Sequence, residues 1–376
     1  MSGGVDSSAA AGLLLEQGYD VVGVTFRLWK PQDEWPDLFA NKVKDDIADA
    51  RKVCDHLGIP HHVIDMREEF KRDVIENFVS EYQAGRTPSP CIVCNQKIKF
   101  GLFYEKAKEL GADFISTGHY ARIDQDKTGI WQLKTSFYPE KDQSYFLYHI
   151  PYDRLPHILF PLGNYTKPQV REIAEKFGFE HVSRKKDSQE ICFIEDGDDY
   201  KAFLRRNGCD LPKGDFVDAD GNILGEHQGI LHYTIGQRKG LGIALGKPAF
   251  VTGIDSEKNQ VVLGDNQDLF KTEVVSDGNI LLGIDFSQLA QQEREARQAD
   301  CGEDGETRSL GIIGFDDMSG ITAKIRYAAK PAAASLKLLP DGKILATFEE
   351  PQRAPTPGQS IVFYRNDLVL GGGFIV

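Results

Sequence analysis

Long apolar runs and an excess of basic residues are both absent from this chain of 376 residues. No run approaches the ~18 apolar residues of a membrane-spanning helix, which excludes a spanning protein. No charged-then-apolar segment opens the chain, so we expect a cytoplasmic protein and not a secreted one. The 44 basic and 57 acidic residues give a net charge of -13, which excludes a wholly basic nucleic-acid binder. A local basic patch that grips nucleic acid stays compatible with that charge, because steering depends on the local field.

Cysteine is also scarce, and the six residues are Cys54, Cys91, Cys94, Cys192, Cys209 and Cys301. In a cytosolic chain of this size we expect no structural disulfide, so these thiols are free, buried or reactive. Cys91 and Cys94 form one C-x-x-C, and no second pair completes a structural zinc site. A helix that starts after this pair, with Lys97 and Lys99 nearby, favours the reactive thiolate. Cys192 follows a basic and polar stretch, residues 184–188, that we expect to be a surface loop.

The order of the predicted elements divides the chain into two parts. Strands predicted over 20–26, 62–66 and 113–117 alternate with helices over 7–17, 44–57, 68–83 and 97–110. This alternation predicts an α/β fold with a doubly wound parallel sheet. Short β runs then follow at 229–233, 250–254, 260–263, 321–327, 333–339, 344–348 and 360–364. They predict two smaller β-rich domains, the last a β-barrel. We therefore expect domains at 1–204, 205–272 and 273–376, with a polar insertion at about 286–308.

Residues 2–8 read SGGVDSS and run directly into a predicted helix. Glycines let backbone N–H groups turn inward, the helix N-terminus adds partial positive charge, and serines add hydroxyl donors, so the loop can cradle a phosphate. No lysine follows the glycines, which excludes the GxxxxGK[ST] loop. A flexible N-terminus with an Asp or Ser helix cap is the alternative. A strand normally precedes such a turn in a doubly wound domain, and we expect that first strand to be missing from this chain.

The loop resembles the SGGxDS signature of the PP-loop ATP pyrophosphatases, and longer blocks make a closer resemblance. They include AGRTPSPCIVCNQKIKF, STGHYAR, KDQSYFL, FPLGNYTKPQVR, KDSQEICFI, GEHQG, YTIGQRKGLGI and PQRAPTPGQSIVFY. Together they are similar to the bacterial tRNA-specific 2-thiouridylases, the MnmA/TrmU family, over nearly the whole chain. SGGxDS alone is shared by many enzymes, whereas the ICFI and YTIGQR blocks are far more specific.

The resemblance implies ATP-dependent sulfur transfer to C2 of the wobble uridine, position 34, of tRNA. It implies adenylation of the uracil O2, with Cys94 as the nucleophile and Cys192 as the persulfide carrier, and a transient disulfide between them. ATP and Mg²⁺ are the implied cofactors, and the implied ligands are Ser2, Gly3, Gly4, Val5, Asp6, Ser7, Ser8, Phe26 and Gly118. The implied partners are tRNAs for Lys, Glu and Gln and a protein that donates persulfide sulfur.

Contacts with tRNA are implied for Ser89, Pro90, Cys91, His119, Lys141, Asp142, Gln143, Arg326, Tyr327 and Gln359. An exposed Arg beside a Tyr suits phosphate pairing and base stacking. The target uridine must be flipped into the pocket, while the β modules grip the tRNA through residues such as Arg238 and Lys239. Simpler interpretations stay open: Phe26 as a core residue, His119 as a satisfied structural histidine, 141–143 as a solvated turn and 326–327 as a solvated strand face.

Cys91 departs from the family pattern, because many relatives have Asp there. With Cys94 and Cys192 it makes a set that resembles the three-cysteine site of other tRNA thiolases, which hold a [4Fe–4S] cluster. A persulfide and a cluster are thus alternative sulfur carriers. Two different functions are also compatible with the loop: a PP-loop synthetase acting on a small molecule, and a non-catalytic tRNA-binding protein. A synthetase would turn over ATP without tRNA, and a binder would not turn it over at all.

Overall fold

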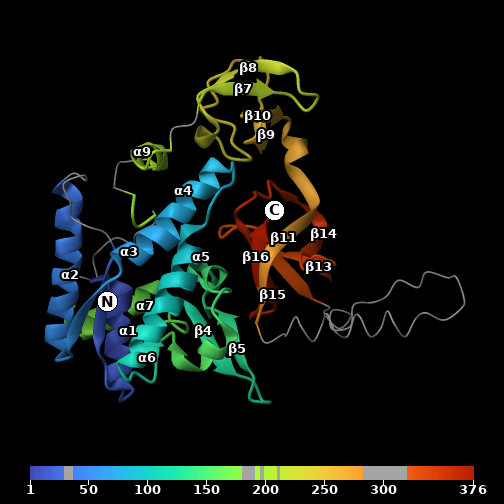
Figure 1. The fold of residues 1–376 in the computed structure, drawn as a ribbon. Coiled ribbons are helices and arrows are strands. Elements are labelled where there is room, and N and C mark those ends of the chain that lie inside the picture. Colours follow the sequence, from blue (N-terminus) through green and yellow to red (C-terminus); the bar gives the residue numbers. More distant parts are fainter. Residues whose placement is uncertain (29–36, 180–190, 195–198, 210–211, 283–319) are drawn as a thin grey trace, which may run out of the picture. The chain divides into compact units, whose positions relative to one another are not determined.

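The computed structural model describes residues 1–28, 37–179, 191–194, 199–209, 212–282 and 320–376 (Figure 1). They form two compact units. Unit 1 comprises Met1–Phe78 and Pro90–Asn207, and unit 2 comprises Val79–Ser89 and Gly208–Val376. Residues 184–188, the predicted insertion at 286–308 and Cys301 lie outside the described residues. None of the helices within the described ranges is long and apolar enough to cross a membrane.

The first part of the chain forms an α/β fold whose central strands pair in parallel. Strand β1 (Gly23–Arg27) pairs with β2 (His61–Asp65), and β3 (Ile115–Ser116) pairs with β6 (Ile158–Leu159). The helices are α1 (Val5–Glu16), α2 (Asp37–Leu57), α3 (Arg67–Phe70), α4 (Glu76–Gln83), α5 (Pro90–Cys94), α6 (Phe103–Glu109), α7 (Lys167–Lys176) and α9 (Tyr200–Arg206). An antiparallel hairpin, β4 (Ala121–Gln125) and β5 (Trp131–Thr135), and short 3₁₀ turns complete the unit. The predicted α/β class is confirmed, and within the described residues of this part of the chain the parallel pairing is present as two separate pairs.

Helix α1 is built to pack closely against α7. Its Ala9, Ala10 and Leu13 side chains lie in one buried cluster with Val170 and Ala174 of α7. Small side chains allow this close approach, because they leave little bulk between the backbones of the two helices. The packing places the loop before α1 beside the start of α7, and this contact matters for the site described below.

Two helical segments wind more loosely than an α-helix. Lys71–Ile75 and Asn95–Leu102 are π-helical, so the predicted helices over 68–83 and 97–110 are each built from more than one winding. A π-helix closes its hydrogen bonds between residues i and i+5. A Cβ on Gly101 would lie 2.7 Å from the carbonyl oxygen of Gln96, five positions earlier, so the glycine permits this turn.

The cysteine pair lies inside a helix, and the expectation that it precedes one is wrong. Pro90 begins α5, because its fixed φ suits the first position of a helix. Cys94 ends α5, and the π-helix follows without a break.

The first β module of unit 2 is a four-stranded sheet in the order β8-β7-β10-β9. The strands are β7 (Gly214–Val217), β8 (Ile223–His227), β9 (Phe250–Asp255) and β10 (Gln260–Gly264). Phe216, Tyr233, Val251 and Val261 belong to its buried core. The strand expected over 229–233 is wrong: a 3₁₀ turn, Ile230–His232, follows Gly229, whose φ of 107° turns the chain.

The second β module closes into a barrel of six strands, drawn in orange and red in Figure 1. The strands in sheet order are β11 (Phe270–Leu281), β14 (Ile344–Arg353), β13 (Ala332–Leu338), β12 (Ile321–Lys324), β15 (Ser360–Arg365) and β16 (Leu368–Ile375). Strand β16 pairs back to β11, which closes the ring. A Cβ on Gly371 would overlap the carbonyl oxygen of Ile280, so closure requires glycine there. The predicted C-terminal barrel is confirmed.

Candidate active site

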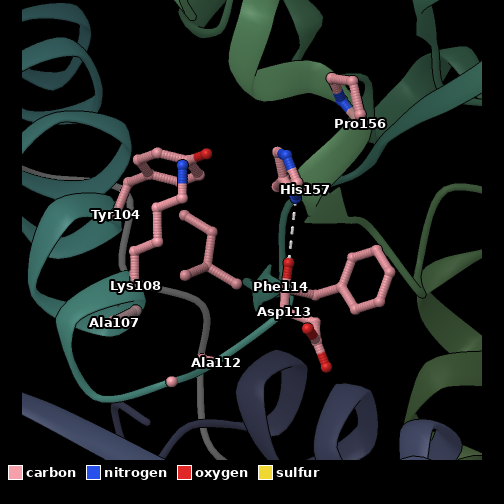
Figure 2. Close-up of a pocket in the computed structure, with 10 residues that line it drawn as sticks. Tyr104, Ala107, Lys108, Ala112, Asp113, Phe114, Pro156 and His157 are labelled. Atoms are coloured by element: carbon pink, nitrogen blue, oxygen red, sulfur yellow. Dashed lines mark hydrogen bonds between the residues drawn. The ribbon is translucent and has the colours of Figure 1, made fainter.

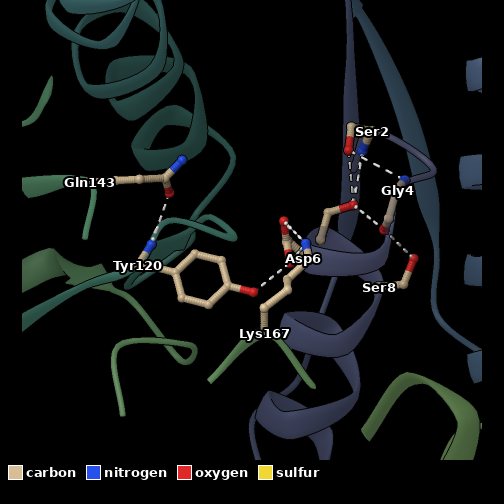
Figure 3. Close-up of polar contacts among 8 residues, drawn as sticks. Ser2, Gly4, Asp6, Ser8, Tyr120, Gln143 and Lys167 are labelled. Atoms are coloured by element: carbon tan, nitrogen blue, oxygen red, sulfur yellow. Dashed lines mark hydrogen bonds and ion pairs between the residues drawn. The ribbon is translucent and has the colours of Figure 1, made fainter. Parts of the chain in front are cut away.

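The SGGVDSS loop forms a tight turn into α1 (Figure 3). Gly3 has a φ of 66°, and a Cβ there would lie 2.9 Å from the carbonyl oxygen of Asp46. Gly4 is the N-cap of α1 and makes no side-chain cap, so the alternative of an Asp or Ser cap is wrong. The first-turn N–H groups of a helix have no intrahelical acceptor, and with the helix dipole they form a site for an anion.

The serines of the loop stabilise its shape. The Ser2 and Ser7 hydroxyls lie 3.1 Å apart, and the backbone N–H of Ser2 donates to Ser7 Oγ at 3.2 Å. The buried Ser8 hydroxyl donates to the carbonyl oxygen of Gly4 at 2.9 Å. These bonds fix the shape of the loop at the start of α1, where the first-turn N–H groups lie.

Two residues that sequence analysis missed hold Asp6. The Tyr120 hydroxyl donates to Asp6 Oδ1 at 2.7 Å, and Lys167 Nζ lies 2.8 and 2.9 Å from the two carboxylate oxygens (Figure 3). Lys167 is the first residue of α7, where a positive charge opposes the helix dipole unless a carboxylate is close. That unfavourable position was a signal for a nearby acidic partner.

Gly118 brings the TGHY turn against the loop. A Cβ on Gly118 would lie 2.9 Å from the carbonyl carbon of Asp6, so only glycine allows this contact. Phe26, near the end of β1, is half-buried and packs edge-on against Phe103 with ring centroids 4.9 Å apart. The exposed part of its ring is compatible with either expectation, a core residue or an adenine contact.

Three of the predicted cysteines lie near one another in unit 1. Cys94 is buried, whereas Cys91 and Cys192 are exposed. Negative charge on Cys94 or Cys91 raises the pKa of Cys192, so the three thiols lie within range of one another's charge. Phe193, next to Cys192, is buried against Phe70 and Phe78, which fixes the backbone beside this thiol.

The expectation of thiolates at rest is wrong. Desolvation by surrounding protein raises the pKa of Cys91 and Cys94, and it raises the pKa of Cys192 to about 12. The positive charge of Lys99 lowers all three values, but desolvation is the larger effect. The resting thiols are therefore protonated at neutral pH.

His119 is half-buried beside the cysteine helix, which is formed by Pro90–Cys94 and the π-helical residues Asn95–Leu102 that follow. Its Nδ1 lies 2.7 Å from Thr117 Oγ1, and its ring packs near Phe100 and Phe160. Desolvation, and then the charge of Lys99, lower the pKa of His119 well below its usual value, so the ring is neutral. A neutral ring with a bonded nitrogen fits the structural alternative and leaves Nε2 for a ligand.

Residues 141–147 contact both the turn that carries Tyr120 and the helical segment that follows Cys94. The buried Asp142 accepts bonds from the Ser136 N–H at 2.8 Å and the Ser144 hydroxyl at 2.8 Å, so it is not a solvated turn residue. Gln143 Oε1 accepts from the N–H of Tyr120 at 3.0 Å. Asn95, next to Cys94, donates to the carbonyl oxygen of Phe146 at 2.9 Å. This segment thus fixes both the Tyr120 turn and the cysteine helix.

In unit 2, Gln359 holds the chain that leads to Ser89. Its Nε2 donates to the carbonyl oxygens of Thr87 at 3.0 Å and Pro88 at 3.2 Å. The N–H of Thr87 donates to the carbonyl oxygen of Pro357 at 2.9 Å. Ser89 itself is half-buried. The Gln359 amide therefore has a structural use in addition to the expected contact with tRNA.

Arg326 and Tyr327 differ in how far they are available to a ligand. The Arg326 guanidinium donates to the carbonyl oxygens of Arg353 at 3.1 Å and Ala354 at 2.5 Å. Tyr327 is 40% exposed, and Lys324 Nζ lies 5.6 Å from the centre of its ring. Tyr327 with Lys324 is the pair that suits stacking and phosphate contact.

Arg238 and Lys239 are exposed on a glycine-rich loop of unit 2. Arg238, Leu241 and Lys247 line a hollow of about 420 Å³ in this loop. Its two basic side chains around a recess suit a phosphate backbone.

A larger hollow of about 480 Å³ is lined by residues that include Asp113 and Phe114 (Figure 2). These two residues come just before β3, whereas Gly118 follows β3. Tyr104 and Lys108 also line the hollow, and His157 Nδ1 lies 3.1 Å from the carbonyl oxygen of Asp113. Ligands of open α/β sheets bind at the carboxyl ends of the strands. This hollow is at the amino end, so it is not the nucleotide site.

The residues fit one of the two implied inorganic groups. Mg²⁺ that arrives on ATP takes most ligands from phosphate and water, so one carboxylate, that of Asp6, suffices. A [4Fe–4S] cluster needs converging thiolates. Within the described residues, no three His, Cys, Asp or Glu side chains are placed to hold a metal ion, and Cys91, Cys94 and Cys192 are not such a set.

Comparison with known proteins covers the whole chain. Residues 1–196 match the family model described as tRNA methyl transferase HUP domain. Residues 201–265 match a tRNA methyl transferase PRC-barrel domain and 314–375 an aminomethyltransferase beta-barrel domain. The NMN synthetase of Francisella tularensis is only weakly similar in structure, with a TM-score of 0.30 and 22% identity over 50% of this chain and 63% of that one.

Curated relatives are similar along their full length. The tRNA-specific 2-thiouridylase MnmA of Clostridioides difficile is 45% identical over 100% of this chain and 96% of its own. Those of Clostridium perfringens and Acetivibrio thermocellus are 44% and 45% identical over 100% of this chain and 96% and 97% of theirs. By its domain order and by this identity, the chain belongs to the MnmA family of tRNA-specific 2-thiouridylases.

Proposed function

We propose that this protein is a tRNA-uridine 2-sulfurtransferase that uses ATP to replace O2 of the wobble uridine by sulfur. The observation that carries the proposal is one compact unit with an anion-binding loop, Ser2–Ser8, and neighbouring thiols, Cys94 and Cys192. Adenylation needs the first and sulfur transfer needs the second. The names of the curated relatives agree with this chemistry.

The loop and its neighbours prepare the base. Ser2–Ser8 bind the pyrophosphate part of ATP, and Asp6 would hold a Mg²⁺ that neutralises phosphate charge. The uracil O2 attacks the α-phosphate, an O–P bond forms, and pyrophosphate leaves. This step converts a poor leaving group into a good one, because AMP then leaves with the C2–O2 electron pair.

The cysteines deliver the sulfur. A persulfide on Cys192 loses its proton and attacks C2, so a C–S bond forms as the C2–O2 bond breaks and AMP departs. Cys94, as the thiolate, then attacks the Sγ of Cys192 and displaces the sulfur that stays on C2. The sulfane sulfur is reduced, the two thiols are oxidised to a disulfide, and an external dithiol restores them.

The remaining expectations complete the proposal. The substrates are tRNAs for Lys, Glu and Gln, whose wobble uridine flips into the pocket beside Pro90, Cys91 and His119. Lys141, Arg238, Lys239 and Tyr327 contact the tRNA. A second protein supplies persulfide sulfur to Cys192. The family description names a methyl transferase, but methyl transfer would not use two neighbouring cysteines. Sulfur transfer would use both, so it is favoured.

The test combines purified protein, ATP, Mg²⁺, a persulfide donor, a dithiol and a tRNA transcript with U34. We expect AMP formation that requires the tRNA and a nucleoside whose mass shows oxygen replaced by sulfur. The same tRNA with C34 is the matched control and yields neither product. AMP formed without tRNA would indicate a synthetase, and no AMP under any condition would indicate a binding protein. A methylated nucleoside formed with S-adenosylmethionine would replace the proposal.

A further inference from the structure

Lys99 lies within range of Cys91, Cys94 and Cys192 and, within the described residues, has no charged partner. It is half-buried in the π-helix Asn95–Leu102. Among the residues that the structure describes, no hydrogen bond or ion pair joins its ammonium group to another side chain. Taking an ammonium group out of water without a counter-charge is unfavourable, so a position of this kind indicates that an anion arrives during function.

The groups that feel this charge are neutral at rest. The positive charge of Lys99 lowers the pKa of Cys91, Cys94, Cys192 and His119. Lys97 is exposed and lies two positions earlier, and its charge is not among the causes that shift these four pKa values. The two lysines, equivalent in the sequence, are therefore distinct in the structure.

The π-helical winding explains the difference. In an α-helix, residues i+3 and i+4 lie above residue i, which would place positions 97 and 98 above Cys94. A π-helix closes its turn at i+5, so position 99 comes above Cys94 and position 97 moves off this face. The loose turn that Gly101 permits thus turns Lys99 toward the thiols and Lys97 toward solvent.

We propose that Lys99 is a catalytic residue of sulfur transfer, the counter-ion that contacts the anionic terminal sulfur of the Cys192 persulfide and then the Cys94 thiolate. The assignment rests on the proposed function. Both anions form in desolvated surroundings, where an opposite charge within a few ångströms has a large effect. Lys99 transfers no proton and no electrons in this role, so the balance of the sulfur-transfer steps is unchanged.

The test measures alkylation of each cysteine by iodoacetamide from pH 7 to 10, with mass spectrometry of the peptides. Only the thiolate reacts, so the rate follows the thiolate fraction. We expect K99M to slow alkylation of Cys192 and Cys94 about tenfold at pH 8, the equivalent of one pKa unit. K97M is the matched control and keeps the wild-type profile, and K99R retains the charge and most of the rate.

Two results would overturn the assignment: a K99M profile that coincides with that of K97M, or a K99R rate as low as that of K99M. The second would indicate a packing role, which the charge-conserving variant separates from an electrostatic one. Single-turnover thiolation should fall with K99M and persist with K99R and K97M. Alkylation needs neither ATP nor tRNA, so a wild type that alkylates as expected but never thiolates tRNA would contradict the proposed function alone.

Discussion

Asp6 is fixed by side chains from distant parts of the chain, and this makes the loop a preformed site. The Tyr120 hydroxyl and Lys167 Nζ meet its carboxylate from 114 and 161 positions away. A ligand that binds a fixed site does not have to restrain that site first, and affinity rises accordingly.

Replacing Tyr120 by Phe removes one bond to this carboxylate and keeps the buried ring. A hydrogen bond to a charged group is worth about 1.5–3 kcal/mol, so we expect ATP affinity to fall about tenfold or more. Isothermal titration with Mg²⁺–ATP measures it. Tyr138→Phe is the control, because its hydroxyl bonds to nothing in the described part of the chain. Equal affinity of both variants would show that the hydroxyl does not prepare the site.

The cysteines should separate into two kinds. Cys94→Ser and Cys192→Ser remove reacting atoms, and we expect each to lower thiolation by about a thousandfold or more. Cys91→Ser should keep most activity, because Cys91 takes no part in the proposed sulfur-transfer steps. Protein purified without oxygen should carry no stoichiometric iron. Iron that is present and lost in Cys91→Ser would establish the cluster alternative.

At the residue scale, the sequence shows which residue types occur near one another along the chain, but it does not show how strongly each side chain is buried. The SGGVDSS loop is legible because its residues are consecutive, whereas Tyr120 and Lys167 reach Asp6 only through the tertiary fold. The thiol pKa values were mispredicted for the same reason: nearby lysines can be counted in the sequence, but the desolvation that outweighs them cannot.

His227 ties together two loops of the first β module. Its Nδ1 accepts from the N–H of Gly229 at 3.0 Å, and its Nε2 lies 3.1 Å from the carbonyl oxygen of Asn259. The side chain is fully buried, and desolvation lowers its pKa. Both contacts require the neutral ring with its hydrogen on Nε2.

This module should therefore lose stability in mild acid. The pKa of His227 is lower in the folded than in the unfolded protein, so its contribution is complete above about pH 6.5 and is lost as pH falls. The slope is at most about 1.4 kcal/mol per pH unit. Urea unfolding followed by circular dichroism at pH 7.5 and 5.5 tests this. His227→Gln should reduce the difference and His62→Gln, in unit 1, should not; equal differences would exclude His227 as the cause.

At the element scale, predictions were good where periodicity is simple. The strands at 250–254, 260–263 and 344–348 have counterparts in β9, β10 and β14. The π-helix could not be foreseen, because its residues suit an α-helix equally well and only packing selects the looser turn. The 229–233 segment has strand-like residues, but the positive φ of Gly229 redirects the chain.

At the scale of the whole molecule, the two compact units predict that a substitution that destabilises one unit leaves the other unaffected. Gly371→Ala places a methyl group against the carbonyl oxygen of Ile280, at the seam where the barrel closes. We expect a loss of about 3 kcal/mol of barrel stability from overlap and strain. Gly342→Ala is the control, since it adds backbone strain with no atom within 4 Å of the new methyl. Circular dichroism with urea should separate the two variants, while ATP affinity stays at the wild-type value in both. Loss of ATP affinity in Gly371→Ala would show that the units depend on each other.

The order of the α/β part and the β modules along the chain could be predicted, but not which residues belong to each compact unit. Alternating helices and strands followed by short β runs fix the sequence of an α/β part and β modules. The assignment of Val79–Ser89 to unit 2 depends on contacts such as that of Gln359 with Thr87, and no local pattern records them.

Gly101 touches no substrate in the proposed reaction, yet the course of the cysteine helix depends on it. Any side chain there would press on the carbonyl of Gln96 and favour the tighter winding, which would rotate Lys99 away from the thiols. In a saturation mutagenesis screen, this position should tolerate as few substitutions as the cysteines do. Mutational intolerance would then mark a residue that controls helical register, at a place where no chemistry occurs.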